Sequence, residues 1–238
     1  MKERGMIFNA EMVRAILDGR KTQTRRPIQW KQTRFTEIGE RDDGSIWPWS
    51  EDAEHACDFW HPCPFGAVGD RIWVRETWGV ASHAFSDDGL MIDWVPDRPA
   101  TAIHEMPFGN GYYSGYAIYA ADGDFTWGDD DGYEDGRSCW KPSIHMPRAA
   151  SRILLEITDV RVERLNAISE EDATAEGVPP AGGLLPDYPG TFLTPKGDFA
   201  TAKVAFQRLW ESIYGEESWK ANGWVWVISF KRVEGGAA

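Results

Sequence analysis

The chain has 238 residues, of which 42% are hydrophobic and 26% are charged. This composition supports a packed core and excludes a chain that is disordered throughout. The formal net charge is −13, whereas proteins that bind nucleic acid are usually basic. The charge is uneven: residues 1–34 hold nine Lys and Arg against three acids, and residues 84–136 hold twelve acids and one Arg. We therefore expect a local basic surface near the N-terminus, where the local field can steer a phosphate-bearing ligand.

The cysteines are odd in number and lie at Cys57, Cys63 and Cys139. The first residues contain no apolar leader segment, and no run approaches the roughly 18–20 apolar residues of a membrane span. We therefore expect free thiols in a reducing compartment and a cytoplasmic protein without a membrane partner.

In the first half of the chain, the pattern predicts short elements separated by irregular segments. Apolar residues with helical i,i+4 spacing are followed by Gly19. Glycine is the residue that most often closes a helix. A stretch rich in Gly, Pro and Asp predicts a loop, and a long acidic stretch predicts a solvated insertion that is ordered around Tyr116–Ala120. The predicted elements in order are a strand at Gly5–Asn9, a helix at Glu11–Leu17, a strand at Lys21–Arg26, a loop at 35–66, a strand at Arg71–Thr77 and the insertion at 84–136.

The second half contains the strongest patterns. Alternation over Ile153–Leu165 predicts a half-buried antiparallel strand. Ser169 is expected to cap a short helix with Asp172 as its capping-box partner, and Gly177 is expected to close that helix. After a Pro- and Gly-rich loop at 179–197, the remaining expectations are a helix at Phe199–Tyr214 and a strand at Trp224–Val233 that is buried on both faces in its first half.

This order of elements favours an α+β fold over a doubly wound α/β fold, because strands outnumber helices and are joined by irregular loops. A small closed mixed β-barrel fits the pattern, since closure removes exposed strand edges.

The densest positive charge follows the first predicted helix. In an extended strand Lys21, Gln23 and Arg25 share one face, and Thr22, Thr24 and Arg26 share the other. Lys21 and Thr24 would converge only if the backbone bends or bulges near Thr22. The alternative interpretation is a solvated edge strand whose charges prevent aggregation.

Four segments resemble the ASCH family: Ile16–Arg26 matches the motif I-L-x-G-x-K-T-x-T-x-R, Val68–Val74 matches a G-D-x-apolar strand entry, Ile168–Gly177 matches a short acidic helix, and Trp226–Lys231 matches a closing strand. The resemblance is to ASCH proteins of phage or prophage type. It implies a PUA-like mixed β-barrel with flanking short helices and a long acidic insertion. The expected organisation is a single domain over 1–238 with insertions at about 35–65, 84–140 and 179–198.

One branch of this family hydrolyses the amide of N-acetylcytidine, and the resemblance implies catalytic roles for Lys21, Thr24 and Glu176. In that interpretation Thr24 is the nucleophile, Lys21 activates it, and Glu176 is the orienting acid or base. No cofactor is implied. The family also binds RNA, so a non-catalytic reader of RNA or modified nucleic acid stays open, as does a phage accessory protein that binds a host protein.

Six further residues are expected to contact the substrate: Arg20, Arg25, Arg26, Glu76, Trp73 and Trp78. Arg26 offers charge to an oxyanion or a phosphate. The two tryptophans can stack on a base, although aromatic core at strand spacing is an equally valid interpretation.

A cluster of His55, Cys57, His61 and Cys63 has the composition of a metal site. It lacks a CxxC pair and contains constraining prolines, so we expect no metal there. The acidic segment lacks the spacing of an EF-hand loop and is interpreted as a solvated lobe or as an acidic mimic that shields the basic surface.

Overall fold

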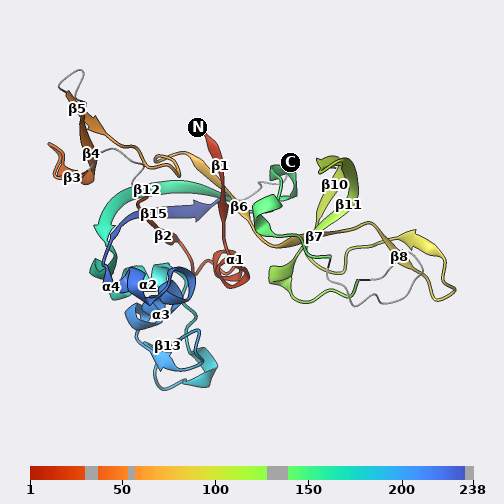
Figure 1. The fold of residues 1–238 in the computed structure, drawn as a ribbon. Coiled ribbons are helices and arrows are strands. Elements are labelled where there is room, and N and C mark those ends of the chain that lie inside the picture. Colours follow the sequence, from red (N-terminus) through yellow and green to blue (C-terminus); the bar gives the residue numbers. More distant parts are fainter. Residues whose placement is uncertain (30–36, 53–56, 128–138, 234–238) are drawn as a thin grey trace. The chain divides into compact units, whose positions relative to one another are not determined.

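The computed structural model describes residues 1–29, 37–52, 57–127 and 139–233, and it is an α+β structure with more strands than helices (Figure 1). The described residues divide into two compact units. The first unit comprises Met1–Lys2, Ala15–Arg71 and Glu156–Arg232. The second comprises Glu3–Arg14, Ile72–Leu155 and Val233.

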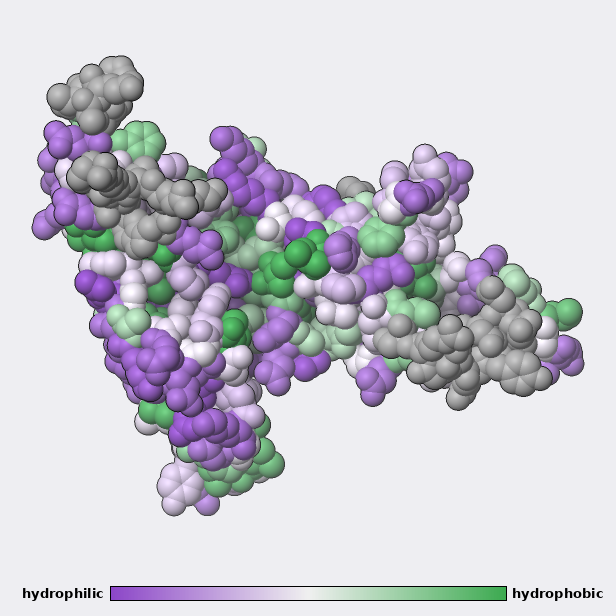
Figure 2. All heavy atoms as spheres, viewed as in Figure 1, coloured by the Kyte–Doolittle hydropathy of each residue, from purple (hydrophilic) through white to green (hydrophobic). Residues whose placement is uncertain are grey.

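The sheet of the first unit carries three helices on one face (Figure 1). In this sheet β15 lies between β12 and β2. Buried residues of the helices and of β15 form one cluster that includes Phe206, Trp210 and Val227. The bounds are β2 Gln23–Pro27, β12 Leu154–Arg164, β15 Trp224–Arg232, α2 Glu170–Ala175, α3 Ala202–Tyr214 and α4 Glu216–Lys220. Figure 2 shows hydrophilic side chains over these helices, as expected for helices with one buried face.

Strand β15 is buried on both faces, which confirms the prediction for its first half. Val225 and Val227 face the helices and belong to their cluster. Trp226 points to the other face, where its ring lies 5.2 Å from that of Trp47. Because side chains alternate along a strand, a continuous apolar run is needed wherever both faces are covered.

The loop predicted at 35–66 is wrong, because three strands pair there in the order β3, β4, β5. Their bounds are β3 Glu37–Glu40, β4 Ile46–Asp52 and β5 Cys57–Trp60. A tight turn joins the first two, since the N–H of Arg41 donates to the carbonyl of Ser45 at 2.8 Å. Asp43 and Gly44 lie in this turn, as their turn preference predicts. Gly39, Pro48 and Asp58 lie inside the strands, so composition alone did not reveal the pairing.

The helix α2 begins after Ser169, whose hydroxyl accepts the N–H of Asp172 at 3.1 Å. This contact confirms the predicted N-cap. The helix α3 begins at Ala202, later than predicted, because Phe199–Ala200 forms β14 and pairs with β13 at Phe192–Leu193. Residues that pair in a hairpin cannot also make helical hydrogen bonds. The loop predicted at 179–197 therefore contains one short strand of this hairpin.

The second unit holds a three-stranded antiparallel sheet in the order β10, β11, β7. Its buried cluster includes Trp78, Tyr119 and Met146. The acidic insertion is thus ordered well beyond Tyr116–Ala120, although residues 128–138 lie outside the described residues. The strand bounds are β1 Glu3–Ile7, β6 Arg71–Arg75, β7 Trp78–Ala81, β8 His83–Phe85, β9 Met91–Asp93, β10 Thr101–Phe108 and β11 Gly111–Tyr119.

Helix α1, Ala10–Leu17, begins among residues of the second unit and ends among those of the first. Short 3-10 helices lie at Ala120–Asp122, Ser143–His145, Arg148–Ala150, Leu165–Ala167 and Gly182–Leu184. None of the helices in the described ranges is long and apolar enough to cross a membrane.

The α+β class is confirmed, whereas the predicted closed barrel is not seen. In a closed barrel the last strand of the sheet pairs with the first. No sheet formed by the described strands has such a pairing. Closure requires consistent tilt and stagger around all strands, and short apolar strands do not by themselves impose that geometry.

We predict that Gly177→Ala destabilises the protein by about 2–4 kcal/mol. Gly177 has φ of +85°, and a Cβ there would lie 2.7 Å from the Cβ of Lys21 and 2.9 Å from that of Ala15. Thermal unfolding followed by circular dichroism measures the change. Gly183→Ala is the matched control, because nothing lies within 4 Å of a Cβ at that position. Equal effects of the two substitutions would contradict the prediction.

Candidate functional site

The C-terminal end of α2 is capped by three consecutive residues from the segment before β2. The last carbonyls of a helix have no helical donors, so they need other partners. Here one backbone N–H and two cationic side chains donate to three successive carbonyls. The contacts are Thr22 N–H to Ala175 O at 2.9 Å, Lys21 Nζ to Glu176 O at 2.7 Å, and Arg20 Nη1 to Gly177 O at 3.1 Å.

Lys21 also forms an ion pair with the carboxylate of Glu176. The Nζ atom lies 2.8 Å from Oε2, and the exposed fractions of the two side chains are 0% and 3%. Burial lowers the pKa of Lys21 below its usual value, against the opposing effect of Glu176. The ammonium also lies at the carbonyl end of a helix, where positive charge is favoured.

Glu176 connects this pair to a larger network of charges. Arg25 Nη1 lies 3.4 Å from Glu176 Oε1, and its Nη2 atom donates to Asp172 at 2.8 Å and to Glu163 at 2.9 Å. Arg161 contacts the same two carboxylates at 2.9 and 2.6 Å. Burial opposes ionisation of Asp172, but hydrogen bonds from both arginines hold its pKa below the usual value.

Gln23 completes this face of β2. Its Oε1 atom accepts from Arg161 at 3.3 Å and from Ser229 at 3.4 Å. Its Nε2 atom is buried without a hydrogen-bond partner. Lys21, Gln23 and Arg25 therefore act on one face of the strand, as the alternation predicts.

Thr24 lies on the opposite face. The register of β2 and β15 is regular and pairs Thr24 with Ile228 and Arg25 with Val227. Residues directly opposite each other in an antiparallel pair point to the same side of the sheet. Arg25 thus shares the helix-covered face with Val227, and Thr24 shares the other face with Ile228. The structure brings Lys21 and Glu176 together, and the role of Thr24 stays a prediction.

The other two basic residues of the motif, Arg20 and Arg26, are both partly exposed. Arg20 forms an ion pair with Asp18 at 3.1 Å. Arg26 lies in β2 opposite Trp226. Their contacts with a substrate remain predictions.

The other three predicted residues belong to the second unit. Glu76 is buried and is held by Arg152 through two contacts of 3.0 Å. Burial raises the pKa of Glu76, against the opposing hydrogen bonds from Arg152. Trp78 is fully buried in the cluster of that unit, with its ring 5.4 Å from Phe108. This is the position of a core aromatic residue, which was the alternative interpretation.

Trp73 of β6 is partly buried, and the guanidinium of Arg75 lies 5.3 Å from its ring centroid. A Cβ at Gly5 would lie 2.6 Å from this ring, so the tryptophan packs closely against β1. Its contact with a substrate stays a prediction.

Four network residues were missed as site residues by the sequence: Gln23, Asp172, Glu163 and Arg161. Arg161 and Glu163 are two apart in a predicted strand, which is a signal that they share a face. Asp172 was expected to complete the capping box, but its carboxylate contacts Arg25 and Arg161 instead. Its partners come from distant segments, and helix spacing does not contain that information.

The cysteine and histidine cluster is only partly described, because His55 lies outside the described residues. His61 Nε2 lies 2.9 Å from the hydroxyl of Ser50. Cys57 is exposed and Cys63 is buried. Among the described residues, no group of three or more His, Cys, Asp or Glu side chains is gathered for a metal ion.

Comparisons with known proteins found no match for this chain among protein-family models, curated proteins or solved structures.

We predict strong coupling between Lys21 and Glu176 in a double-mutant cycle. Lys21→Met alone should destabilise the protein by about 3–5 kcal/mol, because it leaves a buried carboxylate with a weaker set of partners. Lys21→Met combined with Glu176→Leu should cost less than the sum of the single changes. Chemical denaturation measures each free energy of unfolding.

The exposed ion pair of Lys220 and Glu217, also 2.8 Å long, is the matched control. Its substitutions should each change stability by no more than about 1 kcal/mol and should be nearly additive. Additivity at the buried pair would contradict the coupling.

Proposed function

We propose that this chain is an ASCH-type, PUA-like protein directed at a nucleobase, and that its reaction is amide hydrolysis on a modified cytidine such as N-acetylcytidine. The observation that carries the proposal is the 2.8 Å contact between Lys21 Nζ and the Glu176 carboxylate. These residues are 155 positions apart, and they are the pair to which the resemblance assigns proton transfer.

The chemistry requires a group that takes a proton from the attacking hydroxyl and returns it to the leaving nitrogen. Hydrolysis of N-acetylcytidine breaks the amide C–N bond, consumes one water and releases cytidine and acetate. Neutral Lys21 would accept the proton, and its lowered pKa increases the neutral fraction at a given pH. Glu176 would hold the amine in position.

The resemblance supplies Thr24 as the attacking hydroxyl, with water releasing acetate in a second step. The register of β2 turns the Thr24 side chain away from the face of Arg25. The assignment of Thr24 therefore rests on the resemblance, while that of Lys21 and Glu176 also has geometric support.

A second candidate function is a non-catalytic reader of a nucleoside, RNA or modified nucleic acid. It is favoured by the complete burial of the Lys21 side chain and by its two hydrogen bonds to Glu176. A lysine in this environment stabilises the strand against the helix without exchanging a proton with a substrate. For either function we propose a cytoplasmic location, which the exposed thiols of Cys57 and Cys139 support.

Purified protein should convert N-acetylcytidine to cytidine and acetate, measured by liquid chromatography. Lys21→Ala should abolish turnover, because the proton acceptor is removed. Glu176→Gln should reduce turnover strongly, because it removes the charge of the side chain and keeps its shape. Lys231→Ala is the matched control. Lys231 is an exposed lysine of the same unit that pairs with Glu156, and its substitution should leave the rate unchanged.

The absence of turnover by the folded wild-type protein would exclude this reaction. Binding of the nucleoside without turnover, lost in Lys21→Ala, would establish the reader. Thermal unfolding of each variant shows whether a lost rate reflects a lost fold.

The pH dependence gives a second test of the hydrolase. If neutral Lys21 is the base, kcat/KM should rise with pH and level off at a pKa below the usual lysine value of 10.5. The sign follows because only the deprotonated amine accepts a proton. Rates are measured from pH 6 to 10. Lys220→Ala, which removes an exposed lysine, is the control, and its rate should level off at the same pH as that of the wild type. A rate that falls as the pH rises would rule out neutral Lys21 as the base.

A further inference from the structure

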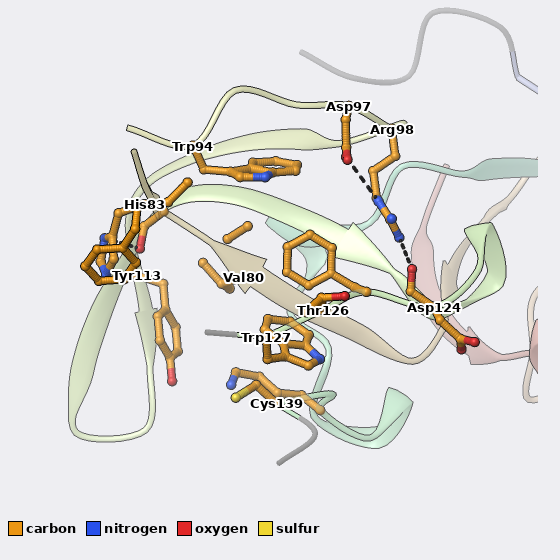
Figure 3. Close-up of a pocket in the computed structure, with 16 residues that line it drawn as sticks. Val80, His83, Trp94, Asp97, Arg98, Tyr113, Asp124, Thr126, Trp127 and Cys139 are labelled. Carbon is orange, nitrogen blue, oxygen red and sulfur yellow. Dashed lines mark hydrogen bonds and ion pairs between the residues drawn. The ribbon is translucent and has the colours of Figure 1, made fainter. Parts of the chain in front are cut away.

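The second unit contains a cavity of about 740 Å³ that is separate from the network around Lys21 (Figure 3). Cavities of roughly 300–1,000 Å³ are typical of small-molecule sites. The walls come from β7, β8 and β11 and from lining residues within 94–98, 124–127 and 139–141. The lining residues used below are Trp94, Tyr113, Phe125, Trp127, Arg98 and Lys141.

The aromatic wall is fixed by ring-to-ring packing. The ring of Phe125 lies 5.9 Å from that of Trp94 and 4.7 Å from that of Trp127, both with edges toward faces. Trp127 in turn lies 5.2 Å from Trp140. Such edge-to-face pairs are favourable and hold the rings in place. In Figure 3, Trp94, Tyr113 and Trp127 border the cavity on different sides.

Gly79 of β7 makes room for this wall. A Cβ at Gly79 would lie 2.5 Å from a ring atom of Trp127. The tryptophan therefore packs directly onto the strand backbone, and any larger residue would displace it. An aromatic surface that is already in position before a ligand arrives loses little conformational entropy on binding.

Arg98 is already engaged by protein groups. Its Nε atom lies 3.3 Å from Asp97, its Nη1 atom donates to the carbonyl of Asp124 at 2.9 Å, and its guanidinium lies 5.0 Å from the Phe125 ring. These contacts join the two segments that form one side of the cavity. Arg98 thus positions the wall.

Lys141 is in a different situation. Its backbone is anchored on β7 by two hydrogen bonds with Trp78, of 2.7 and 3.2 Å. Its ammonium lies 5.0 Å from the Tyr113 ring and 5.8 Å from the Phe108 ring. Within the described part of the chain, no carboxylate forms an ion pair with it. A ring supplies only a weak counter-charge, so this cation has capacity for an anionic partner.

We propose that this cavity binds a planar heteroaromatic compound that carries one anionic group. The ring stacks on the aromatic wall, and the carboxylate or phosphate pairs with Lys141. Asp97 and Asp124 also line the cavity. Their carboxylates repel negative charge, so we expect the cavity to accept a ligand with only one anionic group. This site lies outside the proposed hydrolase centre and does not depend on that function.

The free cysteines allow the ligand to be located. Cys139 lines the cavity and is exposed, while Cys57 is exposed in the first unit. The full chain is treated with iodoacetamide, and labelling of each cysteine is followed by peptide mass spectrometry. Cytidine 5′-monophosphate should slow labelling of Cys139 several-fold and leave Cys57 unchanged. Equal rates with and without the nucleotide, and likewise with orotate, would overturn the proposal.

Four probes separate the contributions of ring and anion in calorimetric titrations. Cytidine 5′-monophosphate and orotate each carry both, cytidine carries the ring, and ribose 5-phosphate carries the anion. Binding by the first or the second identifies phosphate or carboxylate as the preferred anion, and either supports the proposal. Cytidine or ribose 5-phosphate binding as tightly as the complete probes would overturn it. A fifth compound, the cation tetramethylammonium, tests the sign of the charge, and its preferential binding would also overturn the proposal.

Variants assign the two contacts. Lys141→Gln and Trp94→Ala should each weaken binding about tenfold, the scale expected for loss of a charge contact or of one stacked ring. Trp94→Phe keeps a ring and should recover most of the affinity. Lys220→Gln, an exposed lysine of the first unit, is the matched control and should bind as wild type. Wild-type affinity in both Lys141→Gln and Trp94→Ala would contradict the assignment.

Discussion

The first unit depends on the attachment of residues 20–22 to the carbonyl end of α2. Three donors from this segment satisfy three successive carbonyls of the helix end. Buried backbone carbonyls without partners are costly, so the helix end and the start of β2 stabilise each other. Because Lys21 also pairs with the Glu176 side chain at 2.8 Å, the attachment includes a buried charge that requires its partner. Gly177 permits this close approach, since its missing side chain leaves space for Lys21 and Ala15.

The same attachment determines what chemistry the site can perform. A buried lysine beside a carboxylate can accept a proton, because burial favours its neutral form. It is also a stable structural pair, and the network of Arg25, Asp172 and Glu163 strengthens that role. The hydrolase and the reader differ in what they require of the Lys21 ammonium. A hydrolase needs Lys21 to lose a proton during turnover, whereas a reader needs it to stay charged and fixed. Kinetics and binding on the same variants therefore distinguish them.

Aromatic packing organises the second unit, whereas a network of charges organises the site in the first unit. Its sheet carries a buried cluster around Trp78 and Tyr119, and a row of rings from Trp94 to Trp140 extends to a cavity. Acidic side chains in this region do not prevent folding, because they lie outside the apolar cluster. The buried carboxylate of Glu76 accepts two hydrogen bonds from Arg152. A segment that resembles a solvated insertion in composition can therefore form a structured unit with a binding surface of its own.

Local sequence patterns determined the elements whose residues interact with near neighbours. The Ser169 cap, the apolar run of β15 and the shared face of Lys21, Gln23 and Arg25 follow from helix and strand periodicity. The meeting of Lys21 with Glu176 came from a resemblance, because no local pattern relates residues 155 positions apart. Only the tertiary structure decided the strands at 37–60, the partners of Asp172 and the aromatic cavity. Those features depend on which distant segments pack together, and that choice is made by the summed burial and hydrogen bonding of the whole chain rather than by any one segment.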